Sequence, residues 1–100
     1  MVVVRFQVKC MPGKTEAIAA ALRDVAAASR KLAGVVSFDI GRDILDTDAF
    51  IATEVFEDQE ALERQEAQPE VAKALELMGD ALAAPPEATI FRVSSSEPWG

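Results

Sequence analysis

Alternation of apolar and polar residues predicts four β-strands in this chain. In the second of them Val36, Phe38 and Ile40 share a face. In the third, Phe50 and Phe56 share a face that also carries Glu54. The four predicted strands span Val2–Cys10, Val35–Arg42, Ala49–Glu57 and Glu87–Val93.

Apolar residues that recur at steps of three and four predict the helices. The first helix runs from Lys14 to about Leu32. The second helical region starts at a capping residue, Asp58, and is interrupted at Gln68-Pro69. It then continues through Leu82, and Pro85-Pro86 ends it.

The predicted order is β-α-β-β-α-β, with the second helical region split in two, and this order is typical of the ferredoxin-like α+β fold. It predicts one four-stranded antiparallel sheet with the helices on one face. The 100 residues are enough for a single domain. We expect that domain over residues 1–95 and a loose C-terminal tail over residues 96–100. The connection Asp43–Asp48 reads as a polar hairpin turn.

The third strand is apolar on both faces, because Ile51 and Val55 lie opposite Phe50 and Phe56. Strands of this kind are usually covered on both faces. The predicted helices cover only one face, and the chain has no further element for the other. A homodimer, packed sheet against sheet, is therefore expected.

Charge and composition argue against nucleic-acid binding and against insertion into a membrane. The chain has 17 acidic and 10 basic residues, a net charge of −7, and its cations are scattered. Nucleic-acid binding needs clustered Lys and Arg, so it is not expected. No apolar run is long enough to span a membrane. The N-terminal apolar run is too short for a signal peptide, and the expected location is the cytoplasm.

Metal and redox chemistry have few candidates in this sequence. There is no histidine, and Cys10 is the only cysteine, which excludes an intrachain disulfide. Cys10 reads as a small apolar residue at a strand end. Nucleophile triads lack their base, and the clustered aspartates of the turn read as a solvated loop. No metal and no cofactor is expected.

Two polar residues lie beside predicted apolar faces. Glu54 is either a buried acid–base group or one half of an ion pair with Arg42 or Arg92 on a neighbouring strand. Gln65 follows Leu62 by three residues, which places it at the edge of the helix's apolar stripe or makes it a plain surface amide.

Three segments together resemble the antibiotic biosynthesis monooxygenase domain family, of the dimeric α+β barrel group. They are Pro12-Gly13-Lys14 before the first helix, Gly34–Asp39 at the second strand, and Phe50–Asp58 with its strand glutamate. The resemblance covers residues 2–93. It implies a dimeric barrel in which each subunit keeps its own pocket between sheet and helices.

The resemblance also implies an activity and a set of site residues. Similar proteins include cofactor-independent monooxygenases of quinols and polyketide aromatics, and haem-degrading monooxygenases. Glu54 matches the family's strand glutamate, whereas Phe56 stands where the family often has Trp, and Gln65 and Glu70 stand where it often has His. The missing helix histidine argues against haem breakdown. The expected catalytic residues are Glu54, as base or orienting acceptor, and Gln65, as hydrogen-bond donor. The expected pocket residues are Phe38, Phe56, Met78, Glu70 and Arg42.

Two hypotheses stay open at this point. The first is a small dimeric oxygenase that acts on an aromatic hydroxyl compound and uses neither metal nor flavin. The second is a non-catalytic protein of the same fold that binds a small ligand or serves as an accessory in a stress response or pathway. The family resemblance favours the first, and the missing histidines favour the second, because glutamine cannot act as a base.

Overall fold

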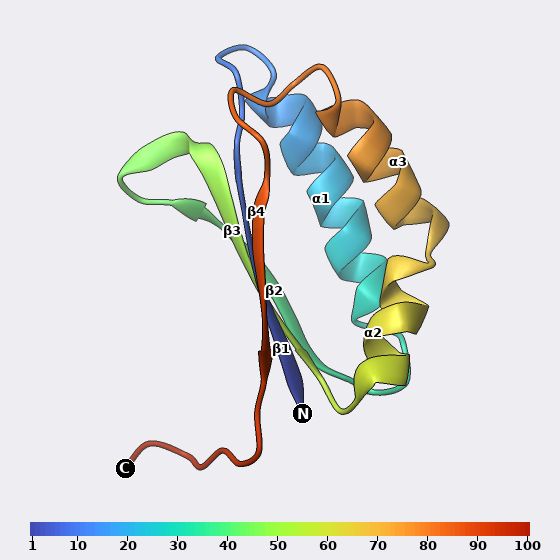
Figure 1. Cartoon of the computed structure of the whole chain (residues 1–100). Helices are drawn as coiled ribbons and strands as arrows, with labels where there is room; N and C mark the ends of the chain where they lie inside the picture. Colours follow the sequence, from blue (N-terminus) through green and yellow to red (C-terminus); the bar gives the residue numbers. More distant parts are fainter.

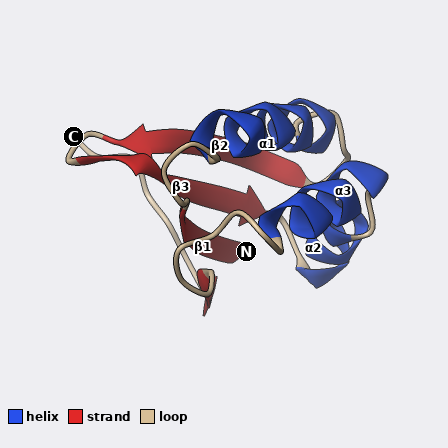
Figure 2. Ribbon diagram, turned by 90° about the horizontal axis from the view of Figure 1, so that it is seen from above, coloured by secondary structure: helices blue, strands red, loops and turns tan.

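The computed structural model describes all 100 residues and confirms the predicted α+β fold. Four antiparallel strands form one sheet in the order β2-β3-β1-β4. All three helices lie on the same face of this sheet, and α1 packs beside α3 (Figures 1 and 2). The elements are β1 (Val2–Lys9), α1 (Thr15–Ser29), β2 (Val35–Asp43), β3 (Asp46–Phe56), α2 (Gln59–Glu66), α3 (Pro69–Met78) and β4 (Glu87–Arg92).

The strand register aligns two rows of side chains across the helix-facing side of the sheet. Because residues that pair across antiparallel strands point to the same face, each row is continuous from β2 to β4. The first row is Phe38, Glu54, Val4 and Ile90. The second row is Ile40, Ala52, Phe6 and Ala88.

Val36 does not share the buried face with Phe38, so that part of the prediction is wrong. The pairing passes from Val35–Phe56 to Ser37–Val55 and skips Val36. An extra residue of this kind disrupts strict alternation. Val35 packs against the core instead, and Val36 is 57% exposed.

The hairpin turn between β2 and β3 is shorter than predicted. The strands continue to Asp43 and restart at Asp46, so Ile44 and Leu45 alone form the turn, almost fully exposed. The Asp43 carboxylate accepts the backbone N–H of Leu45 at 2.9 Å. The Asp46 carboxylate accepts the N–H of Asp48 at 3.1 Å. These local hydrogen bonds stabilise a tight turn where composition alone suggested a six-residue loop.

The helix that follows β3 begins as the capping pattern predicts. Asp58 is its N-cap, and the side chain accepts the backbone N–H of Ala61 at 2.9 Å. Gly34, which precedes β2, lies against the same helix with a φ of +85°. A Cβ at Gly34 would lie 2.7 Å from the Ala61 Cβ, so only glycine fits this approach.

The last helix ends at Met78, four residues before the predicted end at Leu82. The chain beyond it hydrogen-bonds to the end of β1 instead of continuing the helix. Met11 N–H donates to the Ala81 carbonyl, and Ala83 N–H donates to the Lys9 carbonyl, both at 2.8 Å. Backbone pairing with the end of strand β1 therefore replaces the helical pattern that the sequence indicated.

The core between sheet and helices forms two clusters. One surrounds Phe38 and Phe56, and the other surrounds Ile18 and Phe50. The opposite face of the sheet carries Val3, Ile51 and Val55, which are half-buried, and Phe91, which is exposed. Nothing within the chain covers that face (Figure 2). None of the helices combines the length and the apolar character needed to cross a membrane.

Candidate functional site

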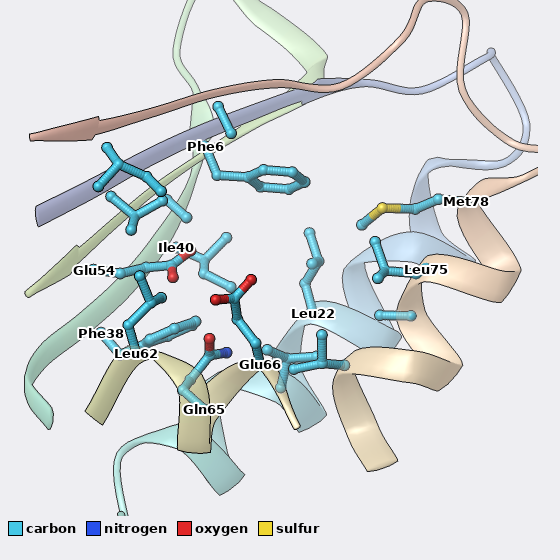
Figure 3. Close-up of a pocket in the computed structure, with 17 residues that line it drawn as sticks. Phe6, Leu22, Phe38, Ile40, Glu54, Leu62, Gln65, Glu66, Leu75 and Met78 are labelled. Carbon is cyan, nitrogen blue, oxygen red and sulfur yellow. The ribbon is translucent and has the colours of Figure 1, made fainter. Parts of the chain in front are cut away.

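A cavity of about 260 Å³ lies between the sheet and the helices. Its floor is made by the two rows of side chains across the sheet, and its roof by residues of α1, α2 and α3 (Figure 3). Fourteen of its 17 lining residues are hydrophobic, so the cavity is an apolar space with a few polar groups. The polar lining residues are Glu54, Gln65 and Glu66.

Glu54 lies at the centre of the floor, and only 9% of it is exposed. The predicted ion pair is wrong: Arg42 pairs with Glu16 at 3.0 Å, and Arg92 donates to Gln59 at 3.0 Å. No cation offsets the cost of taking the Glu54 carboxylate out of water. Burial, followed by the nearby Glu66 carboxylate, raises the pKa of Glu54 to about 7.

Glu66 was not a candidate from the sequence, yet it lines the cavity from the last turn of α2. Its position four residues after the buried Leu62 places it on the same side of the helix. That spacing was the available signal, although Glu66 is also exposed to solvent at the end of the helix. Figure 3 shows its carboxylate directed into the cavity on the side of Glu54.

Gln65 is buried, with 4% of the residue exposed, so the surface-amide alternative is wrong. Its Nε2 donates to the hydroxyl of Ser29 at 3.1 Å. That hydroxyl donates to Oε1 of Gln68 at 3.1 Å. Gln68 Nε2 donates to the carbonyl of Ala28 at 3.2 Å. A continuous chain of hydrogen bonds thus holds Gln65 between α2 and α1.

The structure brings four of the predicted site residues together at this cavity: Glu54, Gln65, Phe38 and Met78. The other three lie elsewhere. Phe56 is fully buried in the core cluster two residues further along β3. Glu70 lines a separate groove on the outer side of α1 and α3. Arg42 stacks over the ring of Phe50, 5.0 Å from its centroid, in a separate groove between α1 and strands β2 and β3.

Sequence reasoning missed most of the apolar walls. Phe6 and Ile40 face the cavity from the sheet, and Leu22 and Leu75 face it from the helices (Figure 3). Each was read as part of an apolar stripe. Which members of a stripe face a cavity depends on strand register and helix packing, and neither is encoded in local periodicity.

No group of three or more cysteine, aspartate or glutamate side chains is placed to bind a metal ion. Cys10 is fully buried in the second core cluster, and burial raises the pKa of its thiol. A protonated, buried thiol is a poor nucleophile. The chemistry that the cavity itself offers is that of Glu54, a carboxyl group that exchanges its proton near neutral pH in apolar surroundings.

A family model described as antibiotic biosynthesis monooxygenase matches residues 1–77. No curated protein matches the chain. A candidate antibiotic biosynthesis monooxygenase from Nitrosomonas europaea superposes with a TM-score of 0.88 at 21% identity, covering 95% of this chain and 100% of that one.

Two further solved structures are similar. A candidate antibiotic biosynthesis monooxygenase from Deinococcus radiodurans gives a TM-score of 0.89 at 17% identity, covering 100% of this chain and 99% of that one. A protein from Pseudomonas aeruginosa gives 0.84 at 24% identity, covering 93% and 94%. At such identities the superpositions show only a shared fold, whereas the match to the family model shows family membership.

Proposed function

The chain belongs to the antibiotic biosynthesis monooxygenase family, and on this premise we propose that it is a monooxygenase acting on a small aromatic hydroxyl compound without a cofactor. The observation that carries the proposal is Glu54, a buried carboxyl group without an ion-pair partner in an apolar cavity. An apolar cavity of about 150 Å³ can hold a benzene ring. The cavity of about 260 Å³ therefore has room for a substituted ring.

In the proposed reaction, Glu54 accepts the proton of a phenolic hydroxyl. The resulting phenolate is a far better electron donor to oxygen than the neutral phenol. With a quinol as substrate, one oxygen atom forms the new C–O bond of a hydroxyquinone, and the other leaves as water. The substrate supplies all four electrons that this reduction of O₂ requires, so the balance needs no further reductant. Phe38, Phe6 and Met78 form the apolar walls that position the ring.

We also propose that the functional unit is a homodimer. The support is the uncovered outer face of the sheet, where Phe91 is 48% exposed beside Val3 and Val55. A second copy packed against this face would bury these side chains. Sedimentation of the wild type should give a dimer at micromolar concentration, and Phe91→Asp should shift it towards the monomer. A wild-type monomer under these conditions would refute the dimer.

A binding protein without turnover is the second candidate function. It is favoured by the absence of histidine and by Gln65, whose amide is held by Ser29 and cannot accept a proton as a base. In this case the cavity holds its ligand, and Glu54 contributes only to recognition.

Oxygen uptake with a panel of quinols and electron-rich phenols tests the proposed reaction. The wild type should consume oxygen, and Glu54→Gln, which keeps the shape of the side chain, should reduce the rate at least about 100-fold. Glu63→Gln, an exposed carboxylate on α2, is the matched control and should retain the rate. Uptake that is unaffected by Glu54→Gln removes Glu54 from the mechanism. No uptake with any compound favours the binding protein.

A further inference from the structure

The polar side chains that line the cavity are two carboxyl groups and one amide, without a cation or a hydroxyl group. Among its lining residues there is no lysine, arginine, serine or threonine. The three polar side chains are Glu54, Glu66 and Gln65, which come from the floor and from α2. Two are carboxyl groups, which in their ionised form accept hydrogen bonds and donate none. The third is an amide, which has one acceptor and two donors.

The orientation of the Gln65 amide follows from the hydrogen bonds behind it. The Ala28 carbonyl can only accept, so Gln68 must turn its Nε2 towards it. Oε1 of Gln68 then accepts the single hydroxyl proton of Ser29. The Ser29 oxygen therefore needs a donor, and Nε2 of Gln65 supplies it. The carbonyl oxygen of Gln65 is left on the cavity side, turned towards the carboxylates (Figure 3).

Glu54, Glu66 and Gln65 are the only polar residues that line this otherwise apolar cavity. Glu66 is near enough to Glu54 for its negative charge to disfavour the ionised form of Glu54. No cation of the chain lines the cavity. An anionic ligand would be repelled by these two carboxylates, whereas a cationic donor would be attracted by both of them.

We propose that the cavity binds a small apolar molecule that carries a protonated primary amine, with the ammonium group among Glu54, Glu66 and the Gln65 carbonyl oxygen. The ammonium group has three N–H donors for these three acceptors. The aromatic walls, Phe6 and Phe38, favour an aromatic body. The net charge of −7 also favours the approach of a cation.

This inference rests on the proposed function for its chemical setting and names the substrate class of the same site. The substrate would be an aromatic hydroxyl compound with an aminoalkyl arm. One oxygen of Glu54 would accept the ammonium group, and the other would accept the hydroxyl proton. After that proton moves to Glu54, Glu66 and the new phenolate would balance the ammonium charge. Binding selectivity itself does not require turnover, so it can be measured separately.

The probes are three compounds that share a 4-hydroxyphenyl body: tyramine, 4-(2-hydroxyethyl)phenol and 4-hydroxyphenylacetate. They carry a cationic, a neutral and an anionic group at the same position. Isothermal titration of the full chain at pH 8, where Glu54 is ionised in the free protein, gives each affinity. Tyramine should bind at least about tenfold more tightly than the alcohol, because charge-assisted hydrogen bonds are the stronger ones. The carboxylate should bind weakest.

Variants assign the effect to the two carboxylates. Glu54→Gln and Glu66→Gln should each reduce tyramine affinity about tenfold or more and leave the affinity for the alcohol within about threefold. Glu63→Gln, on the exposed side of α2, should change neither affinity. Glu66 is solvent-exposed at its helix end, so its variant tests the inference even if Glu54→Gln fails to fold.

Equal affinity for tyramine and the alcohol, or tighter binding of the carboxylate, would overturn the inference. Different results would refute the proposed function and the amine site. Tyramine selectivity without oxygen uptake from any aminoalkyl quinol supports the amine site and refutes the monooxygenase. Oxygen uptake from uncharged quinols without any preference for an amine supports the monooxygenase and refutes the amine site.

Discussion

Replacement of Glu54 by glutamine should change how the stability of the protein depends on pH. In the folded protein burial raises the pKa of the Glu54 carboxyl to about 7, from an ordinary value of 4.5. The folded state therefore holds this proton at pH values where the unfolded chain has lost it. Glutamine keeps a similar volume and has no proton to lose in this range.

The sign of the effect follows from proton linkage. Glu54 contributes fully to the stability of the folded state below about pH 4.5, where both states are protonated. Between pH 4.5 and about 7 only the unfolded state ionises, so the free energy of unfolding falls as pH rises. Above about pH 7 both states are ionised, and the contribution is constant. At about 1.4 kcal/mol for each unit of pKa difference, the total loss is about 3 kcal/mol.

Urea unfolding at half-unit steps from pH 4 to pH 8.5 measures this loss. Other titrating groups are shared by wild type and variant, so the difference between their unfolding free energies isolates Glu54. Glu54→Gln should gain about 3 kcal/mol relative to wild type between the acidic and the alkaline end of the range. Glu63→Gln, exposed on α2, should run parallel to wild type throughout.

The reasoning is refuted if the free energy of unfolding of Glu54→Gln changes with pH in the same way as that of the wild type. It would mean that Glu54 is solvated or finds a cation in solution, and that the cavity does not raise its pKa. The role of Glu54 as a base near neutral pH would then lose its physical support. A gain confined to pH values below 5 would place the pKa of Glu54 near its ordinary value, with the same consequence.

Three further predictions concern the base Glu54, the hydrogen bonds of Ser29 and the close contact at Gly34. The kcat/KM for oxygen uptake should rise with pH and level off above about pH 7 as Glu54 ionises beside Glu66, and a flat profile would exclude Glu54 as the base. Ser29→Ala should lower the free energy of unfolding in urea by about 1–3 kcal/mol, because buried amides lose their partner, whereas Ser96→Ala in the tail should have no effect. Equal free energies of unfolding for Ser29→Ala and Ser96→Ala would show that the buried hydrogen bonds of Ser29 do not stabilise the fold. Gly34→Ala should cost at least about 1 kcal/mol, because of the positive φ and the contact with Ala61; Gly41→Ala, where a Cβ meets nothing within 4 Å, is its control, and equal losses would contradict the argument.

Much of the architecture was predictable because it depends on local periodicity. Alternation along β1 and β3 placed Val4 and Glu54 on the buried face, and the structure confirms both. The Asp58 cap and the break at Pro69 were likewise readable from neighbouring residues. The errors arose where distant segments compete for the backbone. The segment after α3 pairs with the end of β1, so the helix does not extend to Leu82.

The candidate site was predictable only in part. Glu54 and Gln65 stood out because each is a polar residue beside an apolar stripe. Their partners could not be derived from the sequence in the same way. The arginines on the neighbouring strands point to other partners, and Ser29, which orients Gln65, lies 36 residues away in the chain.

By itself the sequence determined the order of the strands and helices, the face of the sheet that the helices cover and the positions of two polar residues among apolar ones. These depend on the period of side chains along one element. The tertiary structure alone decided that Glu54 has no cation, that Glu66 joins it and that Gln65 presents its carbonyl oxygen to the cavity. The reason is that charge and hydrogen-bond direction are set by neighbours in space, which here come from β3, α1 and α2 together.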